Sequence, residues 1–158
     1  MYSVDGKDRV AKWEGIPESS VGAPIPILLS DEHTAIIAYY IQEEEYNDSE
    51  PIAIITFNRC KARIFGPPND EAFSGHPLAS SGLRAHSSFI IQESSWLRTL
   101  IRMNEVHPYH KPSNYEGFNH FVLSFHDSTF ECIAENYEID IARCTINEAI
   151  DLMKQKLN

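Results

Sequence analysis

Two stretches of the chain repeat apolar residues at the spacing of an amphipathic helix. The first covers about residues 95–106, and its apolar stripe consists of Trp96, Leu97, Leu100, Ile101 and Met103. The second covers about residues 146–157 and follows the motif Thr145-Ile146-Asn147-Glu148. In such a capping box, the threonine and the glutamate satisfy backbone amides of the first turn. The pattern therefore predicts two helices that each bury one face.

Most other patterned segments favour β-strands. Alternation, or an apolar run of strand length, marks residues 34–42, 51–57, 59–65, 119–126 and 129–134. Glycine and proline punctuate residues 1–24, which we expect to be an irregular arm. We predict one domain over residues 1–158, of the α+β class, with a mainly antiparallel sheet and a C-terminal β-meander.

The register of the meander follows from its turns. A two-residue turn at Asp127-Ser128 sets Phe125 opposite Phe130 and Leu123 opposite Cys132. An apolar face results, made of Phe121, Leu123, Phe125, Phe130, Cys132 and Ala134. A second turn at Glu135-Asn136 would add a third strand, with Ile139 opposite Cys132.

The other face of this meander is polar. It gathers His120, Ser124, His126, Glu131 and Asp140, with the two carboxylates side by side. Adjacent like charges repel, so the face needs a protonated histidine, an arginine, a raised carboxylate pKa or a metal ion. His126, Glu131, Asp140 and His120 are therefore the candidate catalytic residues for acid–base chemistry.

A metal site is the alternative for this face. His107 and His110 stand three residues apart after the first helix, and with His120 or His126 and a carboxylate they could hold a divalent ion. Isolated histidines are more often structural or exposed, and no motif in the chain demands a cofactor. We therefore expect no bound cofactor.

Charge and cysteine content limit which partners and which cellular compartment the sequence predicts. The formal net charge is −10 over 158 residues, which disfavours nucleic acid and anionic membranes as partners. The acidic residues between Glu43 and Glu50 form either a solvated loop or a docking surface for a basic partner. Three cysteines without a C-x-x-C motif and an N-terminus without an apolar signal segment predict a cytoplasmic protein.

Three segments carry a resemblance: Ser94-Ser95-Trp96-Leu97, residues 103–108, and Phe125-His126-Asp127-Ser128-Thr129-Phe130-Glu131-Cys132. Together with residues 66–71 and 75–78, they resemble a family of small bacterial hypothetical proteins without assigned function. The resemblance implies a bacterial, cytosolic origin and no particular activity.

No reaction motif stands in the sequence, since G-x-S-x-G, the P-loop, G-x-G-x-x-G and H-E-x-x-H are all missing. The sequence alone favours a non-catalytic, acidic binding or regulatory protein that acts through a protein partner, for example as an immunity protein. Two alternatives stay open. One is a small enzyme with a histidine–carboxylate site, acting by acid–base or metal-assisted hydrolysis, and the other is a small-molecule-binding domain.

Overall fold

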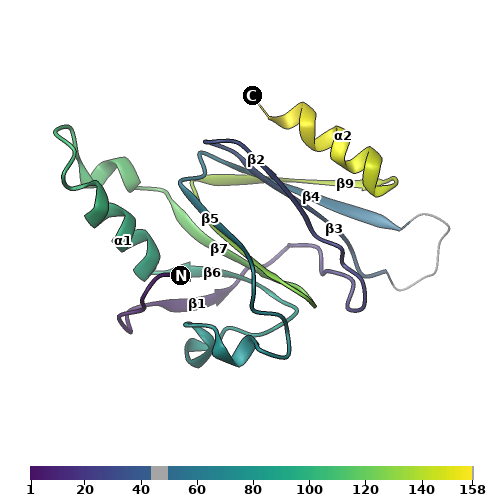
Figure 1. Ribbon diagram of the computed structural model, residues 1–158, viewed down its shortest axis with the longest axis horizontal. Helices are drawn as coiled ribbons and strands as arrows, with labels where there is room; N and C mark the ends of the chain where they lie inside the picture. The colour runs from purple at the N-terminus through teal and green to yellow at the C-terminus, as the bar shows by residue number, and fades with distance from the viewer. Residues whose placement is uncertain (44–49, 158) are drawn as a thin grey trace.

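A computed structural model describes residues 1–43 and 50–157, and its strands form two antiparallel sheets (Figure 1). The larger sheet has the strand order β1-β6-β7-β8-β5. Its strands are β1 (Arg9–Lys12), β5 (Ala62–Gly66), β6 (Ser88–Gln92), β7 (Asn119–Ser124) and β8 (Thr129–Ala134). The smaller sheet has the order β2-β3-β4-β9, with β2 (Ile27–Ser30), β3 (Ala35–Tyr40), β4 (Pro51–Asn58) and β9 (Asn136–Arg143).

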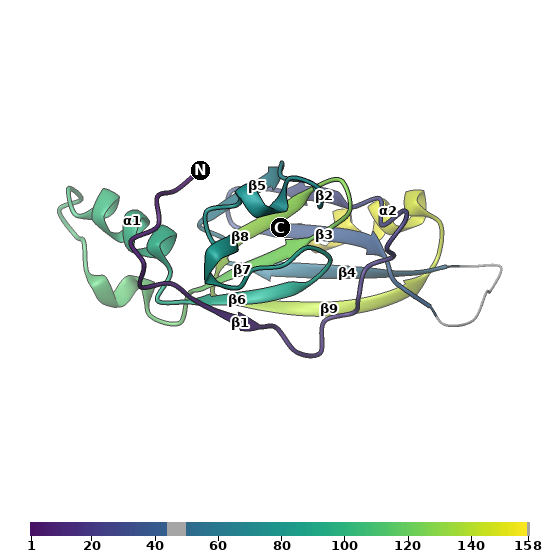
Figure 2. The ribbon, with the colours of Figure 1, turned by 90° about the horizontal axis from the view of Figure 1, so that it is seen from below.

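The main core lies between the two sheets, which are stacked face to face in Figure 2. Ile37 and Tyr39 of β3 and Ile55 and Phe57 of β4 meet residues from β7 and β8 there. All six residues of the predicted apolar face belong to this core: Phe121, Leu123, Phe125, Phe130, Cys132 and Ala134. The alternation of apolar residues along β7 and β8 therefore identified the buried face correctly.

The helices cover the outer faces of the sheets. Helix α2 (Ile146–Lys156) packs Ala149 and Met153 against the outer face of β3 and β4, and Figure 1 shows it in yellow over that sheet. Helix α1 (Ser95–Asn104) packs Trp96 against the outer face of the larger sheet. The predicted α+β class, with mainly antiparallel sheet and two amphipathic helices, is confirmed.

Short 3-10 helices complete the layer around α1. Phe73–Gly75 and Ala79–Ser81 cover the larger sheet beside α1, and Pro112–Tyr115 follows it in the chain. The predicted capping box of α2 is present, with both Thr145–Glu148 bonds formed. No helix in the described ranges combines the length and the apolar character needed to cross a membrane.

The hairpin of β7 and β8 turns one residue earlier than predicted. The Phe125 N–H donates to the Ser128 carbonyl (2.8 Å), so the two turn residues are His126 and Asp127. Leu123 therefore pairs with Phe130, and Phe121 with Cys132. Each residue of β7 therefore pairs with a residue of β8 two positions away from its predicted partner. Because side chains alternate between the two faces of a strand, a shift by two leaves every side chain on its expected face.

The third strand of the predicted meander pairs elsewhere. Strand β9 lies beside β4, with Ile139 opposite Ile55 and Asp140 opposite Ile54. The expected pairing of β9 with β8 is wrong, because the second edge of β8 is already paired with β5. The chain bends at Glu135 and crosses to the other sheet, where it completes the hydrogen bonding of the buried strand β4.

The N-terminal arm is more ordered than its composition predicted. Arg9–Lys12 form β1 at the edge of the larger sheet, and Ser19 makes a single bridge to Ile41. Of the acidic residues between Glu43 and Glu50, those at positions 44–49 lie outside the described residues.

Candidate functional site

Two clusters of histidine and carboxylate side chains lie on the larger sheet. The first, here called the Glu131 network, contains Tyr2, His76, Ser94, His120 and Glu131. The second, here called the Asp70 cluster, contains Asp70, His86 and His126. The Glu131 network uses His120 of β7 and Glu131 of β8, whereas the Asp70 cluster uses His126 of the turn between these strands. The two clusters differ in their access to solvent.

The Glu131 network is buried. The side chains of His76 and His120 are 0% exposed and that of Glu131 is 1% exposed. His76 Nε2 contacts Glu131 Oε1 (2.9 Å), while His120 Nε2 (2.9 Å) and the Tyr2 hydroxyl (2.7 Å) both contact Oε2. The carboxylate of Glu131 is therefore held by three groups from distant parts of the chain.

The hydrogen bonds determine where the protons lie. The Leu78 N–H donates to His76 Nδ1 (3.1 Å), so His76 carries its proton on Nε2 and donates it to Glu131. Ser94 Oγ accepts from the Leu97 N–H (3.2 Å) and can donate its own hydrogen to His120 Nδ1 (2.9 Å). His120 then also donates through Nε2. Each imidazole thus directs its Nε2–H at the ionised carboxylate of Glu131.

This environment stabilises the ionised form of Glu131. Burial by itself raises the pKa of Glu131, but the hydrogen bonds from His120 and His76 outweigh it and lower that pKa to about 2. The network joins the N-terminal arm, the segment around His76, the N-terminus of α1 and two strands. Because no member offers an exposed reactive atom, we interpret the network as structural.

The Asp70 cluster lies nearer the surface. Oδ2 of Asp70 contacts Nδ1 of His126 (2.8 Å) and Nε2 of His86 (3.0 Å). The two imidazoles are roughly parallel, with an angle of 20° between their planes. The side chain of His126 is 43% exposed, that of His86 31% and that of Asp70 19%. One shielded carboxylate oxygen thus holds two accessible imidazoles.

Backbone contacts fix the three residues in place. The Asp70 N–H donates to the His126 carbonyl (2.9 Å), which anchors the start of the segment after β5 on the β7–β8 turn. The Glu71 N–H donates to Asp70 Oδ1 (2.8 Å), so the other carboxylate oxygen faces the imidazoles. His86 has a left-handed backbone (φ +55°), and its N–H donates to Ser124 Oγ (3.3 Å).

The negative charge of Asp70 and the positive charge of His126 stabilise each other. The hydrogen bond from His126 lowers the pKa of Asp70, although partial burial opposes this effect. The same bond and the negative charge of Asp70 raise the pKa of His126. The other nitrogen of His126, Nε2, lies 3.9 Å from the exposed Asp127. His86 Nδ1 is buried and has no hydrogen-bond partner within the described residues.

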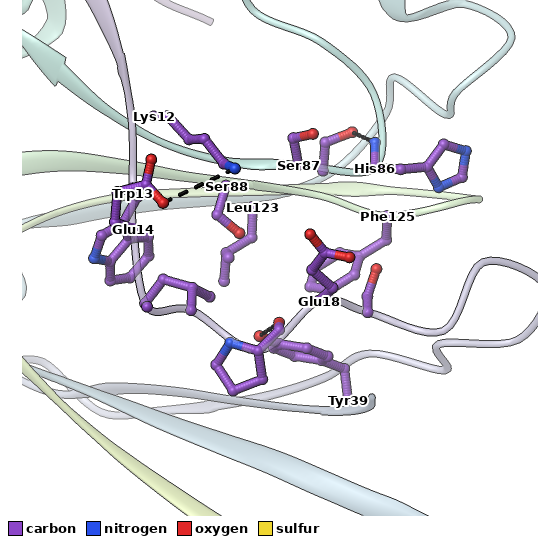
Figure 3. Close-up of a pocket in the computed structure, with 15 residues that line it drawn as sticks. Lys12, Trp13, Glu14, Glu18, Tyr39, His86, Ser87, Ser88, Leu123 and Phe125 are labelled. Carbon is purple, nitrogen blue, oxygen red and sulfur yellow. Dashed lines mark hydrogen bonds and ion pairs between the residues drawn. The ribbon is translucent and has the colours of Figure 1, made fainter. Parts of the chain in front are cut away.

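A cleft of about 190 Å³ opens beside the cluster, between the segment that follows β1 and strands β6 and β7. Figure 3 shows Leu123, Phe125 and Tyr39 along it, together with the charged residues Lys12 and Glu18. The imidazole of His86 points away from the cleft, towards the Asp70 cluster. His86 therefore separates the cleft from the cluster and contributes to both.

The four candidate catalytic residues are not brought together as predicted. His120 and Glu131 do meet, inside the buried network. His126 contacts Asp70 instead of Glu131. Asp140 lies on β9 in the other sheet, where Lys156 Nζ approaches its carboxylate (2.6 Å). The expected repulsion between Glu131 and Asp140 therefore does not arise, because their strands do not pair.

The two candidate metal ligands after α1 also stand apart from these clusters. His107 Nδ1 accepts from the Tyr109 N–H (3.1 Å), and His110 Nδ1 accepts from the Asn104 amide (3.0 Å). Among the described residues, Asp70, His86 and His126 form the group whose geometry suits a metal ion, and neither His107 nor His110 belongs to it.

The sequence patterns did not single out Asp70, His76 or His86 as site residues. Asp70 and His76 lie in the long segment between β5 and β6, and His86 lies close to its end. The length of that segment was the available signal, since long structured loops are often functional. Spacing could not reveal the partners, because 56 positions separate Asp70 from His126.

Comparison of this chain with protein-family models, with curated proteins and with solved structures finds no match.

Proposed function

We propose that this protein is a small hydrolytic enzyme whose active site is the Asp70 cluster. One observation carries the proposal: a single oxygen of Asp70 holds two imidazoles, His126 at 2.8 Å and His86 at 3.0 Å, at a solvent-accessible position. A carboxylate that orients an imidazole is a recurrent arrangement for the activation of water or a nucleophile.

The geometry assigns a role to each group. Asp70 fixes the orientation of both rings, because its other oxygen and its backbone are already bound to the chain. His126 presents its exposed edge to an incoming water molecule. Water can be activated here by transfer of its proton to an imidazole or by binding to a metal ion. Both routes need the same three side chains.

The adjacent cleft, whose lining includes His86 but neither Asp70 nor His126, supplies a place for a part of the substrate beyond the reacting group. At about 190 Å³, it is smaller than the ~300 Å³ typical of sites for drug-sized ligands. Lys12 and Glu18 at its rim and aromatic residues along its wall suit a small group with both polar and apolar atoms. The Glu131 network, by contrast, lacks such access, since its carboxylate is 1% exposed.

A protein-binding role is the second candidate, and an exposed apolar surface favours it. Met103, Val106 and Tyr109, at the end of α1 and in the loop after it, are 68%, 90% and 81% exposed. These three residues lie within seven positions of one another in the chain, and exposed apolar groups that form a continuous patch often contact another protein. The net charge of −10 further supports a basic partner.

Hydrolysis of chromogenic substrates tests the enzymatic proposal. The purified chain is assayed with p-nitrophenyl esters, p-nitrophenyl phosphodiesters and p-nitroanilides, with and without added Zn²⁺. We expect turnover of at least one class, and a loss of about 100-fold or more in Asp70→Ala and His126→Ala. His107→Ala, a histidine outside the cluster, is the matched control and should keep wild-type activity.

Failure of the wild-type chain to hydrolyse any of the three classes would contradict the proposal. Equal activity in the wild type and in both cluster variants would contradict it as well. In either case the exposed surface formed by Met103, Val106 and Tyr109 becomes the leading candidate for function.

A further inference from the structure

We infer that Asp70, His86 and His126 bind one divalent transition-metal ion of the zinc class. This inference rests on the proposed function and deepens it, because it names the cofactor of the same site. Its three ligand atoms are Asp70 Oδ2, His86 Nε2 and His126 Nδ1, which all lie within 4.8 Å of one another.

The spacing of these atoms is close to that of a coordination sphere. In a tetrahedral zinc site with bonds of 2.0–2.1 Å, neighbouring ligand atoms lie about 3.3 Å apart. Here Asp70 Oδ2 lies 2.8 Å from one imidazole nitrogen and 3.0 Å from the other. An ion is admitted when these two distances widen to about 3.3 Å and the two nitrogens, which lie within 4.8 Å of each other, adopt the same separation.

The donor types select the kind of metal. Two imidazole nitrogens and one carboxylate oxygen suit Zn²⁺ and its neighbours in the first transition row. Ca²⁺ requires six to eight oxygen ligands, and Mg²⁺ strongly prefers oxygen. Because three protein ligands leave a coordination position for water, the set has the form of a catalytic site and not of a closed structural one.

Metal binding displaces the two N–H groups that point at Asp70 Oδ2. Without a metal, each imidazole directs an N–H at the same oxygen of Asp70. An ion at their centre accepts a lone pair from each nitrogen, so a neutral imidazole carries its proton on the other ring nitrogen and an imidazolium loses one proton to solvent. A water bound to the ion then becomes more acidic, which is the chemistry that hydrolysis at this site needs.

The site is organised before any ion binds. Asp70 is held through its backbone N–H and through Oδ1, and His86 is held through its backbone N–H by Ser124. His86 also keeps a left-handed backbone (φ +55°), a conformation that is uncommon outside glycine and is often found at functional positions. These contacts reduce the ordering that binding must impose.

The outer shell limits the affinity. Metal-bound histidines usually donate their second N–H to an acceptor, and loss of such a partner costs about 10- to 100-fold in affinity. His126 Nε2 has Asp127 at 3.9 Å, whereas His86 Nδ1 faces no acceptor in the described parts of the chain. We therefore expect exchangeable binding, weaker than that of a structural zinc site.

Calorimetric titration with Zn²⁺ alone tests the inference. The full chain is treated with a chelator, desalted and titrated, and we expect one ion per chain. Asp70→Ala and His126→Ala should weaken binding at least about tenfold, because each removes a ligand. His107→Ala should bind like the wild type. Co²⁺ provides a second readout, since its visible absorption reports coordination by these side chains without any activity assay.

Circular dichroism establishes that each variant is folded, and His126→Ala is the safest variant because its side chain is 43% exposed on a turn. Absence of stoichiometric Zn²⁺ binding would overturn the inference, as would equal affinity in the wild type and the two ligand variants. Zinc binding without hydrolysis supports the inference and contradicts the proposed function. Hydrolysis by a chain that binds no Zn²⁺ supports the proposed function and overturns the inference.

Discussion

At the scale of single residues, Glu131 is a charged group in the interior whose charge is fully compensated by hydrogen bonds. Burial of a carboxylate is unfavourable, yet His76, His120 and Tyr2 each direct a donor at it. The alternation along β8 placed Glu131 on the polar face correctly. It could not show that this face is buried, because the covering residues come from the N-terminal arm and from the segment before β6.

The pH dependence of stability tests this assignment through Glu131→Gln. The folded-state pKa of Glu131 is about 2 against an ordinary 4.5. At about 1.4 kcal/mol per pH unit, this difference corresponds to about 3 kcal/mol of stability. Because the folded pKa is lowered, we expect that contribution to be complete above about pH 5 and to disappear as the pH falls towards 2.

Urea unfolding of the wild type and of Glu131→Gln between pH 2 and 7 measures the effect. The two free energies of unfolding should differ by about 3 kcal/mol at pH 7 and converge at low pH. Glu138→Gln, on the exposed side of β9, is the control and should stay within about 0.5 kcal/mol of the wild type. A constant difference at all pH values would contradict the assignment.

At the scale of secondary-structure elements, local patterns were reliable for helices and for the faces of strands. Thr145 and Glu148 form the expected capping box, and Ala149 and Met153 of α2 are buried as the helical spacing requires. Met103 was expected in the stripe of α1, but it is 68% exposed because the helix extends beyond the sheet that it covers. A periodic apolar pattern predicts how far a helix extends, but it does not show how far the sheet that the helix packs against extends.

Thr145→Ala measures how much the cap of α2 contributes. The substitution removes the side-chain oxygen that accepts from the Glu148 N–H (3.3 Å), so we expect a loss of about 1 kcal/mol in the free energy of unfolding. Gln155→Ala, exposed on the same helix, serves as the matched control and should change stability by less than about 0.5 kcal/mol. Equal stability of the two variants would show that the cap contributes nothing.

At the scale of the whole molecule, the Glu131 network attaches the layer that contains α1 and the 3-10 helices to the larger sheet. The layer on the opposite side, with α2, has no member of the network and packs through apolar residues. The Asp70 cluster lies at the edge of the attached layer, since Asp70 precedes the first 3-10 helix. A well-ordered layer therefore helps to hold Asp70 in position at the candidate site.

Hydrogen exchange in His76→Ala tests this attachment. Loss of a hydrogen bond to a charged group costs about 1.5–3 kcal/mol, which is roughly a 10- to 100-fold faster local opening. We expect faster amide exchange in residues 70–83 and unchanged exchange in α2 and β4. Uniformly faster exchange across the chain would mean that the network stabilises the whole fold and not one layer.

The sequence by itself determined the α+β class, the two helices, and which residues of β7 and β8 face the core. These features follow from periods of 2 and 3.6 residues, which depend only on neighbours along the chain. The exact turn of the hairpin was missed by one residue, but the same periodicity kept the buried face unchanged.

Tertiary structure alone decided which strand β9 joins and which side chains form the sites. β9 pairs with β4 because β7 and β5 already pair with the two edges of β8. No local sequence pattern shows which strand takes an edge. In the same way, His126 meets Asp70 across 56 positions, and Tyr2 meets Glu131 across 129. Such contacts depend on how the layers pack together, so they appear only once the chain is folded.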